Sequence, residues 1–93
     1  MHFFYIIYSK SIDKYYIGET PNIENRLQQH NNHYFKSNFT KAASDWKIVL
    51  SHGCPTKDDS LYLEKFIKKM KSRKFIEKVI YNPEILIDLL KNK

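Results

Sequence analysis

Two residues of the segment 22–30 lie one helical turn apart and carry side chains that can act on a phosphate. Arg26 and His30 are four positions apart, so they share one face if this segment is a helix. A guanidinium can hold a phosphate through two hydrogen bonds and stabilise the charge that develops in phosphoryl transfer. An imidazole can donate to a phosphate oxygen or move a proton. Taken alone, the pair is also consistent with two ordinary exposed side chains.

Glu64 is an acidic residue at the head of a strongly basic stretch. One carboxylate can hold Mg²⁺ if waters and a substrate phosphate complete the octahedron. Lys68 follows one turn later, so Glu64 and Lys68 could instead form an exposed ion pair worth a few tenths of a kcal/mol. Both interpretations of Glu64 stay open at this point.

Four tyrosines lie in two segments that alternate like strands: Tyr5, Tyr8, Tyr15 and Tyr16. Alternation places Tyr5 with Ile7 on one face, and Tyr15 and Tyr16 on opposite faces. Core packing is the simplest explanation of these rings. A phenol in a cationic site would instead ionise more easily and act as a base.

The charge distribution favours a polyanionic partner. The chain has 93 residues and a formal net charge of +6. The stretch from Glu64 through Lys78 contains seven cations, and it could follow a phosphate backbone or simply be a solvated helix face. Arginine suits a bidentate grip on phosphate, and Arg26 is one of two arginines among 16 cations. The predicted nucleic-acid contacts are Lys41, Lys65, Lys68, Lys69, Lys71 and Arg73.

Several other classes of site are excluded or poorly supported. A single cysteine, Cys54, excludes an internal disulfide framework and a thiolate zinc site. The adjacent acids Asp58 and Asp59 fit a helix start better than a two-metal site. No stretch is both apolar and long enough for a signal peptide or a membrane span. We therefore expect a soluble, cytoplasmic protein, and association with the nucleoid stays open.

The elements that would position these residues follow from periodicity and turn signals. Strands over 3–8 and 15–18 form a hairpin, because their connection is too short for a parallel crossover. A helix begins at 20–22 and ends at 31–32, and residues 33–45 form an ordered loop or short helix. A third strand covers 46–52 and ends at the break at 53–55. Helices then begin near residues 56, 72 and 82. We expect a single α+β domain over 1–93, in the order β-β-α-β-α-α-α, with a small, mainly antiparallel sheet of three strands and a C-terminal helix over 82–93.

The order of these motifs resembles that of the GIY-YIG nuclease family. Tyr16-Ile17-Gly18 matches the second half of the family motif, and Phe3-Phe4-Tyr5 keeps the tyrosine of the first half but has Phe3 in place of its glycine. The family's Arg-Leu-x-x-His helix is present from Arg26 to His30. Further matches are Phe39 to Ala43 before Trp46, and Glu64 to Arg73. The resemblance covers residues 3 to about 80 and is strongest to small stand-alone members, which look like the catalytic domain of the excision-repair incision nuclease.

This resemblance implies a phosphodiester nuclease that uses one Mg²⁺ or Mn²⁺ ion. Tyr5 would deprotonate or order the attacking water, and Tyr16 would orient water or phosphate. Arg26 would stabilise the phosphorane-like transition state, and His30 would assist at the phosphate or at the base. Glu64 would be the one protein carboxylate on the metal.

The expected partner is DNA, with RNA also open. We expect no appended specificity module. The resemblance then implies a structure-selective or weakly sequence-specific endonuclease, in DNA repair or recombination, whose specificity is low or comes from a protein partner. The alternatives are a non-catalytic nucleic-acid-binding module that keeps the nuclease fold, and a structural or protein-interaction domain.

Overall fold

A computed structural model describes residues 1–32 and 42–93, and the structural statements below concern these residues. Three strands form one antiparallel sheet: β1 (His2–Ser9), β2 (Lys14–Thr20) and β3 (Lys47–Cys54). Their order is β2-β1-β3, so β1 is central. The helices are α1 (Ile23–Asn31), α2 (Lys57–Met70), α3 (Arg73–Tyr81) and α4 (Glu84–Lys91). The α+β class and the predicted element order are confirmed.

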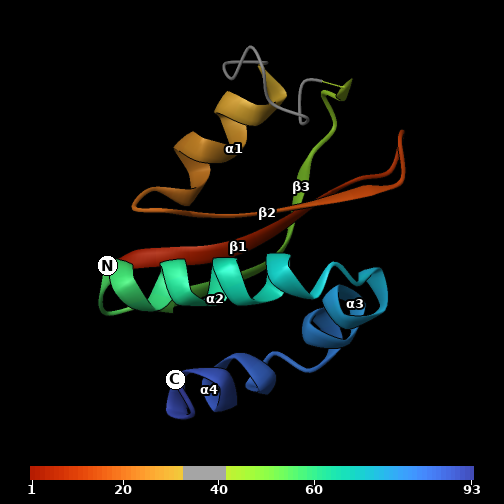
Figure 1. The fold of residues 1–93 in the computed structure, drawn as a ribbon. Coiled ribbons are helices and arrows are strands. Elements are labelled where there is room, and N and C mark those ends of the chain that lie inside the picture. The colour runs from red at the N-terminus through yellow and green to blue at the C-terminus, as the bar shows by residue number, and fades with distance from the viewer. Residues whose placement is uncertain (33–41) are drawn as a thin grey trace.

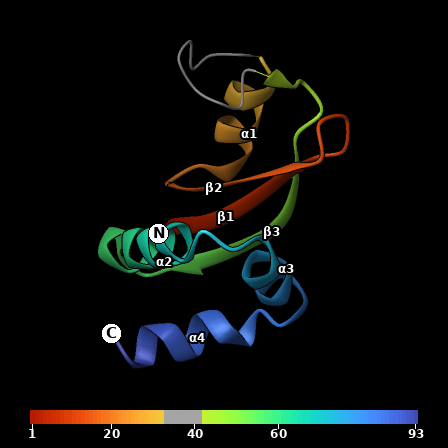
Figure 2. The same ribbon diagram turned by 45° about the vertical axis from the view of Figure 1, so that its right-hand side comes forward.

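The helices divide between the two faces of the sheet. Helix α1 lies over one face, whereas α2, α3 and α4 lie on the other side (Figure 1). The same division is visible after a 45° turn (Figure 2). Because side chains alternate along β1, this central strand contributes to a separate core on each side.

The larger core lies between the sheet and helices α2, α3 and α4. Its buried members are Phe4, Ile6, Ile17, Cys54, Leu63, Ile67, Val79 and Leu86. The smaller core on the α1 side contains Tyr5, Ile7, Ala43 and Trp46, with Ile23 and Leu27 of α1 packed against it. The predicted division of the β1 side chains between two faces is therefore correct.

Side-chain caps define where three of the helices begin. Asn22 accepts a hydrogen bond from the backbone N–H of Asn25 at the start of α1, and Thr56 accepts one from Asp59 at the start of α2. The predicted break near residue 72 is present: Lys71 has a left-handed backbone with φ of 48°, and Ser72 then caps α3.

The third strand differs from the prediction at both ends. It continues through Gly53 and Cys54, which pair with Phe3 and His2 of β1, and it stops before Pro55, which has no N–H to donate. Trp46 lies outside the strand, because its backbone N–H and C=O bond to the side-chain amide of Asn31 at 2.7 and 3.0 Å.

Two further expectations concern residues 33–45 and the absence of a membrane span. Residues 33–41, which hold Phe39 and Lys41, lie outside the described residues, so the predicted loop or short helix is not addressed there. Among the described residues, no helix is both long and apolar enough to cross a bilayer.

Candidate active site

Tyr5 lies at the centre of the candidate site, on the middle strand of the sheet. Its side chain is only 2% exposed, and it faces the α1 side. The Tyr5 Oη lies 2.9 Å from Nε2 of His30, within hydrogen-bond distance. His30, on the last turn of α1, is 1% exposed. The fold therefore joins a strand residue and a helix residue that are 25 positions apart.

Gly18 explains how the Tyr5 ring reaches His30. Gly18 is the direct partner of Tyr5 across the β1–β2 ladder. A Cβ at this position would lie 2.5 Å from Tyr5 Oη and 2.6 Å from its Cζ, closer than side chains pack. The glycine of the Tyr16-Ile17-Gly18 segment is thus required by the close approach of the phenol to the β2 backbone.

Tyr16 brings a second phenol to the same face from the edge strand β2. Its ring centroid lies 4.8 Å from that of His30 and 6.5 Å from that of Tyr5. The Lys68 Nζ lies 5.6 Å from the centroid of the Tyr16 ring, in a cation–π contact. Tyr16 therefore links the α1 side of the site to helix α2.

Burial and charge keep Tyr5 and His30 neutral at pH 7. Desolvation, and secondarily the positive charge of Arg26, lowers the pKa of His30 to about 4. Burial, followed by the nearby Tyr16, raises the pKa of Tyr5 well above its usual range, although Arg26 acts in the opposite direction. The expectation of an easily ionised phenol is therefore wrong for Tyr5, because desolvation outweighs the local positive charge.

Glu64 approaches this group from helix α2. Its Oε2 lies 3.3 Å from Lys68 Nζ, and its side chain is 18% exposed. The charges of Glu64 and Arg26 both act on the Tyr5 phenol. The structure thus gathers Tyr5, Tyr16 and His30 by direct contact, and places Arg26 and Glu64 close enough to act on Tyr5 electrostatically.

The cations expected to contact nucleic acid are exposed, but they differ in their surroundings. Lys65, Lys68 and Lys69 lie on α2, and Lys71 ends it. Arg73, at the start of α3, donates to the Asp13 carboxylate at 2.6 Å and to the Glu77 carboxylate at 3.3 Å. Its charge is therefore partly compensated by acids of this chain. Lys41 lies outside the described residues.

One acidic group near the site escaped the sequence analysis. The Glu19 Oε2 lies 3.1 Å from Nδ1 of His2 and accepts a hydrogen bond from the buried Ser60 hydroxyl at 3.3 Å. Its charge also acts on Tyr5. The position of Glu19 directly after Gly18 was the one sign in the sequence that could have pointed to it. Its partners come from β1 and α2, and no spacing in the sequence reveals them.

Comparison with known proteins agrees with this architecture. The family model described as "GIY-YIG catalytic domain" matches residues 1–78. A UPF0213 protein of Syntrophus aciditrophicus (strain SB) is 35% identical over 69 residues, which cover 74% of this chain and 79% of that protein.

The fold is also found among solved structures. The solution NMR structure of a UPF0213 protein from Bacillus halodurans superposes with a TM-score of 0.55 at 22% sequence identity, covering 86% of this chain and 82% of that one. This similarity extends the agreement from the motifs to the arrangement of strands and helices. The chain therefore belongs to the GIY-YIG nuclease-domain family.

Proposed function

We propose that the chain is a metal-dependent endonuclease that hydrolyses phosphodiester bonds in DNA. The observation that carries this proposal is the buried contact of 2.9 Å between Tyr5 Oη and His30 Nε2, with the opposite charges of Arg26 and Glu64 acting on the same phenol. This arrangement combines a proton-transfer pair with a cation and a carboxylate, which together can activate water and stabilise the charge that develops in phosphodiester hydrolysis. Membership in the nuclease-domain family supports the same class of reaction.

Glu64 is the residue that would hold the metal ion. Residues 1–32 and 42–93 contain no cluster of three or more His, Cys, Asp or Glu side chains suited to a metal. A lone carboxylate fits Mg²⁺, because this ion keeps several waters and takes further oxygens from substrate phosphates. When bound, it would supply Lewis-acid polarisation of a phosphate oxygen. In the structure, Lys68 supplies the positive charge beside Glu64.

The neutral Tyr5–His30 pair supports a defined route for the proton. In the neutral tautomer whose Nε2 carries no proton, His30 would accept the Tyr5 hydroxyl proton, and the phenolate so formed would then take a proton from the attacking water. Arg26 would stabilise the negative charge that develops on the phosphate and would lower the cost of the transient phenolate. Tyr16 would orient the water or the phosphate.

Cleavage assays test this proposal directly. Purified protein is incubated with branched, nicked and supercoiled DNA in Mg²⁺, beside Glu64→Ala and a matched control, Glu84→Ala, which changes an exposed glutamate at the start of α4. We expect cleavage by the unaltered chain and by Glu84→Ala, strongest on branched DNA, and loss of it in Glu64→Ala. Cleavage no greater than that of Glu64→Ala on every substrate would refute the proposal.

A second assay separates catalysis from binding. Tyr5→Phe keeps the ring but removes the hydroxyl, so we expect cleavage to fall about 100-fold or more while DNA binding in a chelating buffer is unchanged. Salt-sensitive binding without cleavage in any variant would instead favour a non-catalytic binding module.

A further inference from the structure

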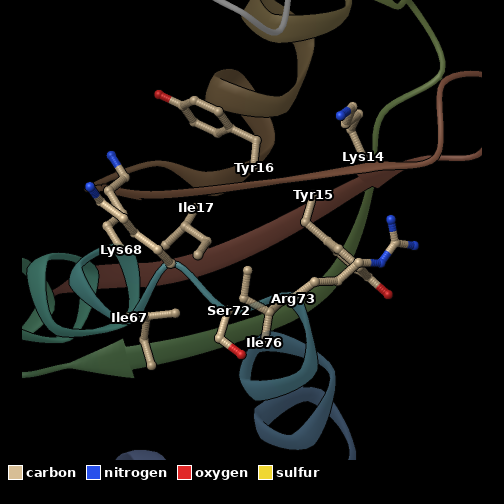
Figure 3. Close-up of a pocket in the computed structure, with 10 residues that line it drawn as sticks. Lys14, Tyr15, Tyr16, Ile17, Ile67, Lys68, Ser72, Arg73 and Ile76 are labelled. Atoms are coloured by element: carbon tan, nitrogen blue, oxygen red, sulfur yellow. The ribbon is translucent and has the colours of Figure 1, made fainter.

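A cavity of about 450 Å³ opens beside the candidate active site. It lies between β2, the C-terminal end of α2 and the start of α3. Tyr16 and Lys68 line both the cavity and the candidate site. Figure 3 shows Tyr15 and Ile17 directed from β2 toward the helices, whereas Tyr16 points to the opposite side of the strand. A nucleic-acid strand bound at Tyr5 and Tyr16 would thus meet this cavity where it passes the edge of the sheet.

The cavity has an apolar interior under a positively charged rim. Ile17, Ile67 and Ile76 form apolar parts of its lining. Its cations are Lys14, Lys68, Lys71 and Arg73, and no acidic residue lines it among the described residues. Such a combination suits a ligand with a flat apolar part and a negatively charged part.

Two of these cations are available to a ligand. Lys68 and Arg73 are paired with carboxylates of this chain. In the described part of the chain, Lys14 and Lys71 form no ion pair, and both side chains are exposed. Phosphates at the rim could therefore bind without displacing an internal partner.

One wall of the cavity is a stack of π-systems. The guanidinium carbon of Arg73 lies 5.1 Å from the centroid of the Tyr15 ring, and the Tyr8 ring centroid lies 4.8 Å from that of Tyr15. The Tyr15 ring therefore has two partners within the chain and supports the guanidinium plane of Arg73. The Tyr15 hydroxyl donates to Glu77 at 3.3 Å, and Arg73 is held by Asp13, so both planes are fixed before a ligand arrives. Aromatic rings and guanidinium planes are the surfaces on which unpaired bases stack.

We infer that this cavity binds the base of an unpaired nucleotide in the strand that is cut, with the adjoining phosphates on Lys14 and Lys71. The inference rests on the proposed function and narrows its substrate to nucleic acid with a single-stranded or flapped segment beside the scissile bond. A base-paired nucleotide cannot enter an apolar hollow, because its stacking faces and pairing edge are already occupied. A flat basic surface would suffice for duplex DNA.

Binding measurements without metal test this inference independently of cleavage. Fluorescence anisotropy is measured in a chelating buffer with labelled oligo(dT) and with a hairpin duplex. We expect Tyr15→Leu, which removes the ring, to weaken oligo(dT) binding at least fivefold with little effect on the duplex. Tyr15→Phe, which keeps the ring, should retain most of the oligo(dT) affinity.

A charge variant tests the rim separately. The double variant Lys14→Gln, Lys71→Gly should weaken oligo(dT) binding and reduce the slope of log K against log salt by about 1.4, since each phosphate contact with a single strand contributes about 0.7. The charge-matched control Lys47→Gln, Lys91→Gln changes exposed lysines of β3 and α4 and should leave the slope nearly unaltered.

Photocrosslinking gives a test that does not depend on the folding of a variant. An oligonucleotide that contains 5-iodouracil should form its adduct on Tyr15 and not on its neighbour Tyr16, which points to the opposite side of the strand. Three outcomes would each overturn the inference. Adducts could form only outside the cavity, or Tyr15→Leu could lose as much affinity for the duplex as for oligo(dT). Poly-glutamate at equal charge could also displace oligo(dT). Loss of cleavage with these binding results intact would contradict the nuclease proposal alone.

Discussion

Tyr5 and His30 form a buried polar pair that is stable only while both groups are neutral. Their side chains are 2% and 1% exposed, so neither can keep its hydration shell if it becomes charged. The hydrogen bond between them satisfies a buried donor and a buried acceptor at once. The same arrangement that could pass a proton in the reaction therefore also makes folding sensitive to pH.

Acidification is expected to destabilise the fold through His30. Its pKa in the folded chain is about 4, below the ordinary value of 6.5, so the unfolded state binds the proton more readily. The stabilising contribution is complete above about pH 6.5 and is lost as the pH falls toward 4, by up to about 3 kcal/mol. Urea denaturation at pH 7 and pH 4.5 measures this change.

The matched control for the pH effect is His30→Gln, which keeps a polar amide but cannot titrate. Its stability should vary less between pH 7 and pH 4.5 than that of the unaltered chain. The hydrogen-bonded carboxylates of Asp13 and Asp45 have lowered pKa values, so their contribution is lost at still lower pH. Equal pH dependence in both proteins would contradict the assignment to His30.

Gly18→Ala should disturb the candidate site more than the size of a methyl group suggests. The added Cβ would lie 2.5 Å from the buried Tyr5 hydroxyl, so the phenol must move away from His30. We expect a loss of about 1–3 kcal/mol of unfolding free energy and a fall in cleavage. Denaturation and the cleavage assay measure these two effects.

Gly53→Ala is the matched control for Gly18→Ala. Its Cβ would meet the Sδ of Met1 at 2.8 Å, but Met1 is 74% exposed and its flexible end can move into solvent. A destabilisation by Gly53→Ala as large as that by Gly18→Ala would show that glycine in the sheet, and not the Tyr5 contact, is responsible.

At the scale of elements, the candidate site depends on the junction between α2 and α3. Helix α2 carries Glu64 and Lys68 toward the edge strand, and the left-handed residue Lys71 turns the chain into α3. Ser72 then caps α3, whose first residue, Arg73, bonds to Asp13 in the β1–β2 turn. This junction fixes how the cationic rim faces β2.

Lys71→Gly should stabilise the junction despite the loss of a side chain. Lys71 has φ of 48°, a backbone conformation that costs a residue with a Cβ about 1 kcal/mol and costs glycine little. We expect a gain of about 0.5–1 kcal/mol in unfolding free energy, measured by urea denaturation. Lys71→Ala removes the same charge but keeps the strain, so it should give no such gain. A gain of equal size in both variants would assign the effect to charge instead.

Local signals in the sequence predicted the elements well. The structure contains the predicted helix starts at 20–22 and near 56, the break near 72 and the alternation along β1, all of which depend on neighbours within a few positions. The ends of β3 were wrong because Gly53 and Cys54 gain strand partners from β1, and the sequence gives no sign of that pairing.

Long-range contacts were the part that the sequence could not supply. Helical spacing brought Arg26 and His30 to one face, but the burial that lowers the pKa of His30 comes from packing against the sheet. Arg73 appeared to be one more phosphate contact, and only the fold reveals its bond to Asp13, 60 positions away. Glu19 and its bond to Ser60 were missed for the same reason.

The chain has a net charge of +6, but its cations differ in whether an acid of the same chain already pairs with them. Several cations neutralise acids of the chain itself, as Lys68 does at Glu64 and Arg73 does at Asp13. Exposed lysines along β2, α2 and the α2–α3 junction carry the remaining positive charge beside the candidate site. Nucleic-acid affinity should therefore depend on a subset of the lysines and not on the total charge.

Salt dependence measures how many of these lysines act. If Lys14, Lys65, Lys69 and Lys71 each neutralise one phosphate of a single strand, log K should fall against log salt with a slope of about −3. Arg73→Ala should change that slope less than Lys71→Gly does, because the guanidinium is already paired with Asp13 and Glu77. Anisotropy titrations in a chelating buffer between about 50 and 200 mM salt, over which the Debye length falls from about 14 to about 7 Å, give both slopes. A larger change for Arg73→Ala would mean that bound nucleic acid displaces these acids from the guanidinium.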